Sequence, residues 1–315
     1  MSPEVVVSAC PVGQFFAFTY HIAAEVPTLV DTATAGAPAR DIAPSLEEAG
    51  RRLEDVRVIL LTHGHLDHAG GAREVWQLTG GTADIAIHGE DVRLLERADA
   101  HLELHGRVND QFLRGAADEE LPRIVDTLFS GGVSPGIVLS GDETFDLGDA
   151  TVRAVHTPGH SPGAVTYWIE RVGRAFVGDA VQVHGGEMNR FPSYEDPARY
   201  RESLRLLLDI EPASLSLAHR FVTADGSVLP GHIDGADAVR KVITWSLEIE
   251  ERIAEAASRH LSPDPTPDID SPYHPFTRIA HDLHYQLDPT RFPSPFFITL
   301  GGYARSLGFT PITAP

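Results

Sequence analysis

Cysteine is almost absent from this chain of 315 residues, because Cys10 is the only one. A single cysteine excludes an intrachain disulfide and a metal site built from several thiolates. Basic residues are also few: 25 Lys and Arg stand against 45 Asp and Glu, which gives a formal net charge of −20. Since nucleic-acid affinity depends on neutralising phosphates and no basic cluster stands out, the chain is a poor candidate for binding DNA or RNA.

Long apolar runs are missing too. No segment approaches the roughly 20 apolar residues that span a bilayer, and the N-terminal letters M-S-P-E lack the basic region of a secretory signal peptide. We therefore expect a cytoplasmic protein that does not work in a membrane. An apolar content of 42% and a charged content of 22% are typical of a globular chain, and this length allows one large domain or two.

The most informative segment, residues 58–71, reads V-I-L-L-T-H-G-H-L-D-H-A-G-G. Its first four residues indicate a short buried strand. Four potential metal ligands follow within six positions: His63, His65, Asp67 and His68. Imidazole and carboxylate are good ligands for Zn²⁺ and related ions, and alternate residues of an extended turn point the same way. His63 and His65 can therefore share one metal, while the other two face a second point nearby; a polar turn with surface histidines is the weaker alternative.

This H-x-H-x-D-H arrangement resembles the most specific motif of the metallo-β-lactamase superfamily. Further candidate ligands follow expected strands in the order that the family uses. His160 stands in the loop T-P-G-H-S-P-G, Asp179 follows the expected strand 174–177, and His219 follows the expected strand 215–218. The family usually has a glycine before the last histidine, where this chain has alanine.

The resemblance covers roughly residues 5–225 and implies an α/β fold, the four-layer αββα sandwich of the superfamily, with a binuclear metal site. One ion would be held by His63, His65 and His160. The second would be held by Asp67, His68 and His219, and Asp179 would bridge both. The implied cofactors are two Zn²⁺ per chain, with Fe or Mn as the other candidates.

The resemblance also implies a hydrolase. Metal coordination lowers the pKa of a water shared by the two ions from about 16 toward 7, and the resulting hydroxide would attack a carbonyl. Antibiotic-hydrolysing members typically lack the bridging aspartate, so Asp179 makes the chain similar to glyoxalase II-like thioesterases and lactonases. We therefore expect a small-molecule carboxylic ester, thioester or lactone as substrate. The candidate catalytic residues are Asp67, Asp179 and Tyr194.

The segment between Asp179 and the expected helix 197–209 could contact the substrate or protonate the leaving group. Lactonases of this type have a tyrosine near the metals, which makes Tyr194 the main candidate. The others in this segment are His184, Asn189 and Arg190. Arg220, beside the last ligand, either pairs with an anionic substrate or faces solvent. Asp31, after an early expected strand, either supports the metal site from behind or is an ordinary turn carboxylate.

Residues 89–133 predict helices that interrupt the sandwich. We interpret them as an insertion that could cover the active site. Its histidines, His101 and His105, are expected on the surface rather than at a metal. A hairpin is expected after the insertion, at residues 144–155, because two alternating segments flank a Gly-Asp turn.

The C-terminal third departs from the superfamily pattern. We assign residues 1–228 to the catalytic domain and residues 229–315 to a helical extension. Within the extension, apolar spacing predicts a long helix at 232–260 and a further helix at 275–287, joined by the Pro-rich linker 262–267. The extension could pack on the sandwich, line the substrate pocket or form a homodimer face.

Other functions remain as alternatives within the same resemblance. A persulfide dioxygenase-like oxidoreductase would use similar histidines with one iron. A flavodiiron protein would need a flavodoxin-like domain, which the extension does not resemble. A nuclease is disfavoured by the negative charge, and a non-catalytic binding module is disfavoured because all seven ligand positions are filled.

Overall fold

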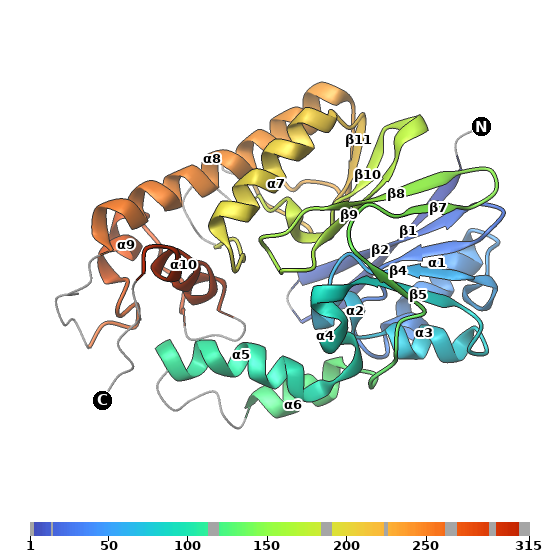
Figure 1. Cartoon of the computed structure of the whole chain (residues 1–315), viewed down its shortest axis with the longest axis horizontal. Helices are drawn as coiled ribbons and strands as arrows, with labels where there is room; N and C mark the ends of the chain where they lie inside the picture. The colour runs from blue at the N-terminus through green and yellow to red at the C-terminus, as the bar shows by residue number, and fades with distance from the viewer. Residues whose placement is uncertain are drawn as a thin grey trace.

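The chain, described here as a computed structural model, contains two six-stranded sheets packed face to face and covered by helices (Figure 1). The described residues are 3–13, 15–112, 120–183, 191–223, 226–261, 270–289 and 294–308, the side chains of 109–111 excepted. Within them, no helix combines the length and the apolar character needed to cross a bilayer.

The first sheet has the strand order β1-β2-β3-β4-β5-β6. Its strands are β1 (Glu4–Val12), β2 (Phe15–Ala23), β3 (Thr28–Val30), β4 (Val58–Leu60), β5 (Asp84–His88) and β6 (Ile137–Leu139). The strands β1 to β3 pair antiparallel, and β3 to β6 pair parallel. Because parallel strands end at the same edge, the segments that follow β4 and β5 lie near each other.

The second sheet has the strand order β12-β11-β10-β9-β8-β7. Its strands are β7 (Thr144–Asp146), β8 (Thr151–His156), β9 (Val165–Ile169), β10 (Arg174–Phe176), β11 (Ser214–Ser216) and β12 (His232–Asp234). Only β10 and β11 pair parallel, whereas the other neighbours pair antiparallel. The predicted hairpin is confirmed as β7 and β8. Since β8, β10 and β11 run in the same direction, their carboxyl ends also share one edge.

Three apolar cores separate the four layers. The outer helices are α1 (Ala43–Glu48) and α3 (Ala72–Leu78) on one side and α7 (Pro197–Ile210) and α8 (Ala236–His260) on the other. Tyr167 and Phe176 belong to the core between the sheets. Leu46 packs into the core beneath α1 and α3, and Leu204 into the core beneath α7 and α8. The predicted αββα sandwich is confirmed.

The helix expected at 197–209 is confirmed as α7. Asp196 accepts a hydrogen bond from the backbone N–H of Arg199 at 3.1 Å, and Pro197 occupies the first turn, where no backbone donor is required. The start of the helix expected at 232–260 is wrong. His232–Asp234 pair with β11 as the edge strand β12, and Gly235, with φ of 93°, lets the chain turn into α8.

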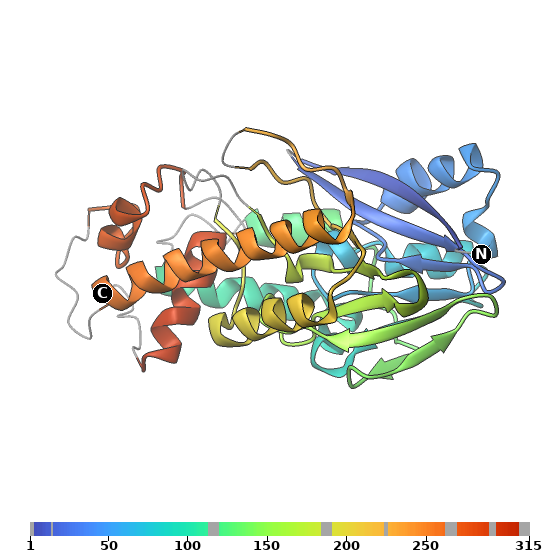
Figure 2. The same ribbon diagram turned by 90° about the horizontal axis from the view of Figure 1, so that it is seen from above.

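Several helices lie outside the sandwich layers, and α9 and α10 lie at the end of the molecule away from the N-terminus (Figures 1 and 2). They include α2 (Leu66–Ala69), α4 (Val92–Glu96), α5 (Ala98–Phe112), α6 (Glu120–Leu128), α9 (Thr277–Asp282) and α10 (Pro295–Ser306). The helical nature of the predicted insertion is therefore confirmed. The helix expected at 275–287 is shorter than predicted, and the linker 262–267 lies outside the described residues.

Helix α10 is fixed to both the insertion and the sandwich. Phe112 of α5 stacks on Phe297 of α10 with ring centroids 5.1 Å apart. Glu250 of α8 is fully buried, and its carboxylate accepts hydrogen bonds from Arg201 of α7 at 2.6 and 2.8 Å and from the Tyr303 hydroxyl at 2.6 Å. These contacts hold α10 against α5, α7 and α8.

Candidate metal centre

The seven predicted ligands converge where strands of both sheets end. His63, His65, Asp67 and His68 follow β4, whereas His160, Asp179 and His219 follow β8, β10 and β11. Their imidazole nitrogens and carboxylate oxygens form overlapping groups in which the potential ligand atoms lie within 4.8 Å of one another. The structure therefore brings together residues that the sequence places in four separate loops.

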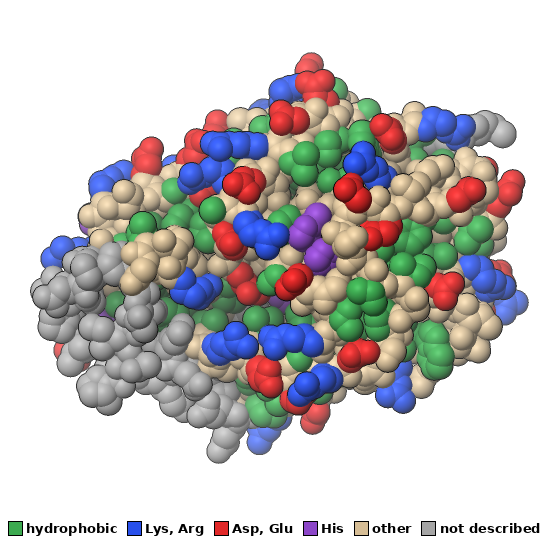
Figure 3. All heavy atoms as spheres, viewed as in Figure 1, with side chains coloured by type: hydrophobic (Ala, Val, Ile, Leu, Met, Phe, Trp, Pro, Cys, Tyr) green, Lys and Arg blue, Asp and Glu red, His purple; other side chains and the backbone are tan. Residues whose placement is uncertain are grey.

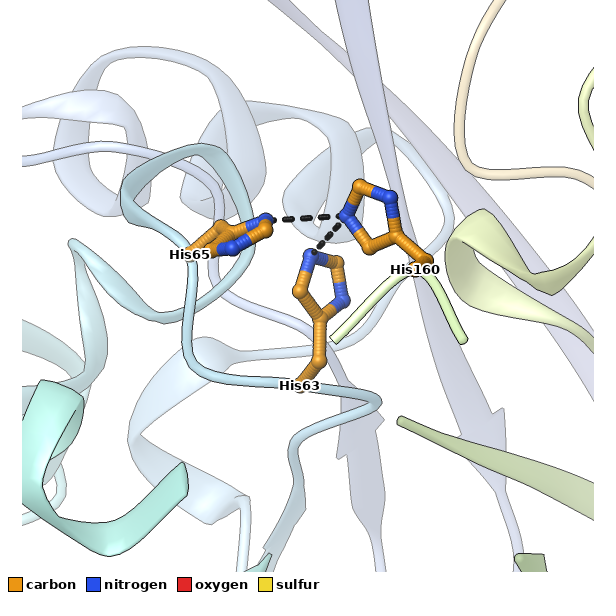
Figure 4. A group of neighbouring side chains, drawn as sticks. All are labelled: His63, His65 and His160. Carbon is orange, nitrogen blue, oxygen red and sulfur yellow. Dashed lines mark hydrogen bonds between the residues drawn. The ribbon is translucent and has the colours of Figure 1, made fainter. Parts of the chain in front are cut away.

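The first group contains His63, His65 and His160. The Nε2 atom of His160 lies 2.8 Å from Nδ1 of His65 and 3.1 Å from Nε2 of His63. Figure 4 shows the three rings directed toward one another, two from the loop after β4 and one from the opposite loop. This arrangement presents three nitrogens to a common point.

The second group contains Asp67, His68 and His219. The Nε2 atoms of the two histidines lie 3.3 Å apart, and Oδ2 of Asp67 lies 3.4 Å from Nε2 of His219. Asp179 stands between the groups. Its Oδ1 lies 3.2 Å from Nε2 of His219, and its Oδ2 lies 3.4 Å from Nε2 of His160. One carboxylate therefore faces both groups, with one oxygen toward each.

The outward nitrogens of three histidines are held by oxygen acceptors. Nδ1 of His160 donates to the carbonyl of Ser193 at 2.5 Å, and Nδ1 of His219 donates to the carbonyl of Phe16 at 2.9 Å. Nδ1 of His68 lies 2.8 Å from Oδ2 of Asp31. Because these oxygens can only accept, each Nδ1 carries the proton, and Nε2 of each ring faces the centre.

The nitrogen and oxygen atoms that face the centre need a positive charge between them. Two neutral rings would direct the Nε2 lone pairs of His68 and His219 at each other. Burial would lower the pKa of His219, but the carboxylates of Asp179 and Asp67 raise it to about 10. Oδ1 of Asp179 is fully buried and accepts no well-formed hydrogen bond from the described residues. A divalent cation fits this set of nitrogen and oxygen donors, because it would satisfy both the lone pairs and the orphaned oxygen.

The imidazoles of His63 and His65 are suited to act as neutral ligands. Burial, together with the neighbouring histidines, holds the pKa values of His63 and His65 well below the usual range. Burial would raise the pKa of Asp179, but His219 and His160 hold it well below the usual range. Neutral imidazoles and an ionised carboxylate are the protonation states that metal binding needs.

Asp31 supports this centre rather than forming an ordinary turn. Its backbone adopts φ of 60°, and its carboxylate accepts hydrogen bonds from the backbone N–H of Thr62 at 2.7 Å and from the Thr62 hydroxyl at 2.8 Å. The same carboxylate contacts His68. Asp31 therefore fixes both the end of the first ligand loop and the orientation of one imidazole.

Two glycines allow the ligand loops to approach their neighbours. Gly159, before His160, has φ of 130°, and a Cβ there would lie 2.4 Å from the backbone nitrogen of Tyr200. Gly178, before Asp179, has φ of 49°, and a Cβ would lie 2.6 Å from the Thr62 hydroxyl. Side chains at these positions would displace the loops that carry the ligands.

Asp91 is a buried carboxylate that the sequence did not single out. It follows β5 and joins the two loops of the first group. Oδ2 accepts hydrogen bonds from the backbone N–H of Gly64 at 2.9 Å and from the Ser161 hydroxyl at 2.8 Å, and Oδ1 accepts one from the N–H of Gly163 at 3.0 Å. Gly64 lies between His63 and His65, so Asp91 links both loops through groups adjacent to the ligands.

Tyr194 does not join the centre, and its predicted place near the metals is wrong. Its fully buried ring stacks on Tyr200 with centroids 4.4 Å apart, and its hydroxyl lies 3.4 Å from that of Tyr303. The physical reason is the direction of the chain: Ser193 and Glu195 line the cavity described below, and the residue between them points to the opposite side.

The histidines of the insertion differ from the surface residues that were expected. His101 is 1% exposed, and its Nε2 donates to the carbonyl of Leu94 at 2.7 Å. His105 lines the cavity, with its ring centroid 6.3 Å from that of His65. Arg220 lies 4.7 Å from the ring centroid of Phe16. Three further candidates fall outside the described residues: His184, Asn189 and Arg190.

A cavity of about 880 Å³ opens onto the centre. His65, Asp67, His160 and Asp179 form part of its lining. Its other walls come mainly from α5, α6 and α10. In Figure 3, this face is hollowed between the positions of α5 and α10, and both blue Lys and Arg and red Asp and Glu side chains border the hollow. The insertion and the C-terminal extension therefore both line the space beside the candidate ligands.

Comparison with known proteins agrees with this geometry. The family model described as the metallo-beta-lactamase superfamily matches residues 22–219. The chain belongs to that superfamily. The matched region includes all seven predicted ligands and ends at the last of them, whereas the helices α8 to α10 lie beyond it.

Individual relatives are distant. An uncharacterized protein of Bacillus subtilis is 29% identical over 61% of this chain and 77% of its own length. A hydroxyacylglutathione hydrolase of Acidiphilium cryptum is 29% identical over 62% of this chain, which spans only 61% of that relative. A solved metallo-beta-lactamase family protein from Thermus thermophilus has a TM-score of 0.71, is 22% identical, and matches 96% of this chain and 94% of its own. At that identity the likeness concerns the fold alone.

Proposed function

We propose that this chain is a metal-dependent hydrolase that cleaves a carboxylic ester, thioester or lactone. The observation that carries the proposal is the position of Asp179, whose two oxygens face two different groups of ligand atoms. Membership of the superfamily and the name of the Acidiphilium relative support the same class of reaction. The proposed cofactors are two divalent ions, with Zn²⁺ favoured by the nitrogen and carboxylate donors.

Each ligand group would hold one ion. His63, His65 and His160 would bind the first, Asp67, His68 and His219 the second, and Asp179 both. When bound, such ions supply a Lewis acid for a carbonyl oxygen and lower the pKa of a coordinated water toward 7. Ser193, Phe16 and Asp31 orient the imidazoles through their outward nitrogens, so the ligand atoms are positioned before a metal arrives.

The cavity would hold the substrate against this centre. A volume of about 880 Å³ suits a small molecule rather than a polymer. Partly buried apolar side chains on α5 and α6 would displace water from the acyl group. The polar end of the cavity, at Asp67 and Asp179, would lie next to the reacting carbonyl.

The first test is the metal content of protein purified without added metal, measured by elemental mass spectrometry. The wild type, Asp179→Ala and Asp55→Ala are compared, because Asp55 is an exposed aspartate remote from the centre. Hydrolysis of a panel of thioesters, esters and lactones is measured on the same samples. The expected result is about two divalent ions per chain in the wild type and the control, with fewer ions and at least about a hundredfold less hydrolysis in Asp179→Ala.

Two results would overturn the proposal. One iron per chain that survives in Asp179→Ala would favour the mononuclear dioxygenase-like reaction, which oxygen uptake with a persulfide would then show. Metal-loaded protein that hydrolyses no member of the panel would refute the hydrolase assignment while leaving the metal centre intact.

A further inference from the structure

The cavity continues well beyond the metal centre, and its far walls are apolar. Leu104 and Val108 of α5, Ile124 of α6 and Ile298 of α10 line it and are half-buried. They come from three helices that lie outside the sandwich. Half-buried apolar side chains that face a cavity favour a ligand with a hydrocarbon portion, because its burial removes apolar surface from water.

Three arginines line the same cavity, one from each of these helices: Arg107 of α5, Arg123 of α6 and Arg305 of α10. The concentration is unusual in a chain with a net charge of −20. None of the three forms an ion pair with a carboxylate of the described residues. Arg305 instead donates to the backbone carbonyl of Glu195 at 3.0 Å. Among the described residues, no carboxylate therefore lies within ion-pair distance of these guanidinium groups.

Away from the metal centre, two carboxyl groups also line the cavity: Glu120 and Glu195. Their negative charge does not fully offset the positive charge of the three arginines. Burial and the nearby carboxylate of Asp91 raise the pKa of Glu195 to about 7, against the opposing effects of Arg305, Arg107 and Arg93. The carboxyl group of Glu195 therefore keeps its proton to a higher pH than an exposed glutamate does. The lining away from the metal centre retains a net positive charge.

We infer that the cavity selects substrates that carry an anionic group, a carboxylate or a phosphate, joined to the scissile acyl group through a hydrocarbon portion. The inference rests on the proposed function and narrows its substrate class. The apolar walls contact the hydrocarbon, and the arginines bind the anion through paired N–H donors, which match planar or tetrahedral oxyanions. The anion belongs either to the acyl chain or to the leaving group.

The test uses thioesters matched in length and shape. Suberyl and octanoyl thioesters of N-acetylcysteamine differ only in a terminal carboxylate against a terminal methyl group. The octanoyl thioester of mercaptopropionate places the carboxylate on the leaving group instead. For each substrate, kcat/KM is measured with the wild type, with Arg107→Gln, Arg123→Gln and Arg305→Gln singly and combined, and with Arg153→Gln as a control on an exposed arginine outside the cavity.

One of the two anionic thioesters is expected to exceed the neutral one by about tenfold or more in kcat/KM, which corresponds to roughly one charge-assisted contact. The ratio of kcat/KM for the anionic thioester to kcat/KM for the neutral one is expected to fall toward one in the triple variant, which combines all three cavity substitutions. The same ratio is expected to be unchanged in Arg153→Gln. The anionic thioester with the higher ratio identifies the side of the substrate that carries the charge. Equal values for all three thioesters, or a ratio that the triple variant preserves, would refute the inference while the hydrolase proposal stands.

A binding measurement decides the inference even if no thioester is hydrolysed. The affinities of suberate and of its neutral diamide are measured by calorimetry with the wild type and the triple variant. Suberate is expected to lose about tenfold in affinity in the triple variant relative to the diamide. Suberate binding that does not respond to loss of the arginines would overturn the inference independently of catalysis.

Discussion

Replacing Asp91 by asparagine tests whether the metal centre depends on a contact outside the ligand set. Asp91 is 1% exposed and joins the loop of His63 and His65 to the loop of His160. Asparagine has nearly the same shape but only one acceptor oxygen. We therefore expect Asp91→Asn to destabilise the fold and to weaken metal binding by the first group of ligands.

The magnitude follows from the three hydrogen bonds. An amide oxygen in the position of Oδ2 can still accept from Gly64 and Ser161, but both bonds lose the charge of the acceptor, at about 1 kcal/mol each. The amide NH₂ then faces the N–H of Gly163, which becomes an unsatisfied buried donor at about 1–3 kcal/mol. Because asparagine is neutral, the variant no longer bears the cost of burying a charge, and this offsets part of the lost stability. The expected net loss is about 2–4 kcal/mol of unfolding free energy.

Chemical unfolding and competition with a chromogenic chelator measure the two effects separately. Ser161→Ala, which removes one of the three bonds, is expected to cost about 1 kcal/mol. Asp99→Asn is the matched control, because this exposed carboxylate pairs with an exposed arginine, Arg97, outside the metal centre. Metal affinity is expected to fall by about tenfold to a hundredfold in Asp91→Asn. Reduced stability with unchanged metal affinity would refute the proposed link between the loops and the metal.

Two other predictions follow from the cavity and its surroundings. The Tyr194 hydroxyl contacts the hydroxyl of Tyr303, so Tyr194→Phe is expected to change kcat by less than about twofold. The lost hydrogen bond is expected to lower the free energy of unfolding by about 1 kcal/mol in a denaturant titration. A hundredfold loss of kcat would show that this hydroxyl acts in the reaction. Glu195 gains its negative charge as the pH rises through about 7, so the Kd of suberate is expected to increase about fivefold from pH 6 to pH 8 through roughly 1 kcal/mol of repulsion. In Glu195→Gln the calorimetric Kd is expected to be nearly independent of pH, and a profile equal to that of the wild type would exclude Glu195 as the titrating group.

The local pattern of an apolar strand followed by clustered histidines predicted a metal site in the loop after β4. The sandwich and the convergence of all seven ligands were implied by the resemblance to the superfamily, because His160, Asp179 and His219 follow expected strands in the order that the family uses. Asp31 was left open between two roles, since its contact with His68 depends on a parallel pairing of β3 with β4 that the sequence does not specify.

The remaining features depend on packing between distant helices. Helical periodicity identified the insertion, but it could not show that α5 contacts α10 or that Arg305 reaches the same cavity as Arg107. Tyr194 was misplaced because an extended segment alternates its faces, and a change of one residue in register reverses the assignment. The strand β12 had a usable signal: a glycine precedes and follows the three residues H-I-D, which favours a short strand over the start of a helix.

The metal ligands and the cavity arginines lie on different parts of the fold, so metal binding and substrate recognition depend on different elements. The ligands lie at strand ends and are tied together by Asp91 and Asp31, within the sandwich. The arginines lie on α5, α6 and α10, and α10 is fixed to α8 through the buried Glu250. Substitutions in the helical walls can therefore change the anion that is recognised without moving the atoms that bind metal. A sandwich of this kind can acquire a new substrate through its added helices while the chemistry at the strand ends is retained.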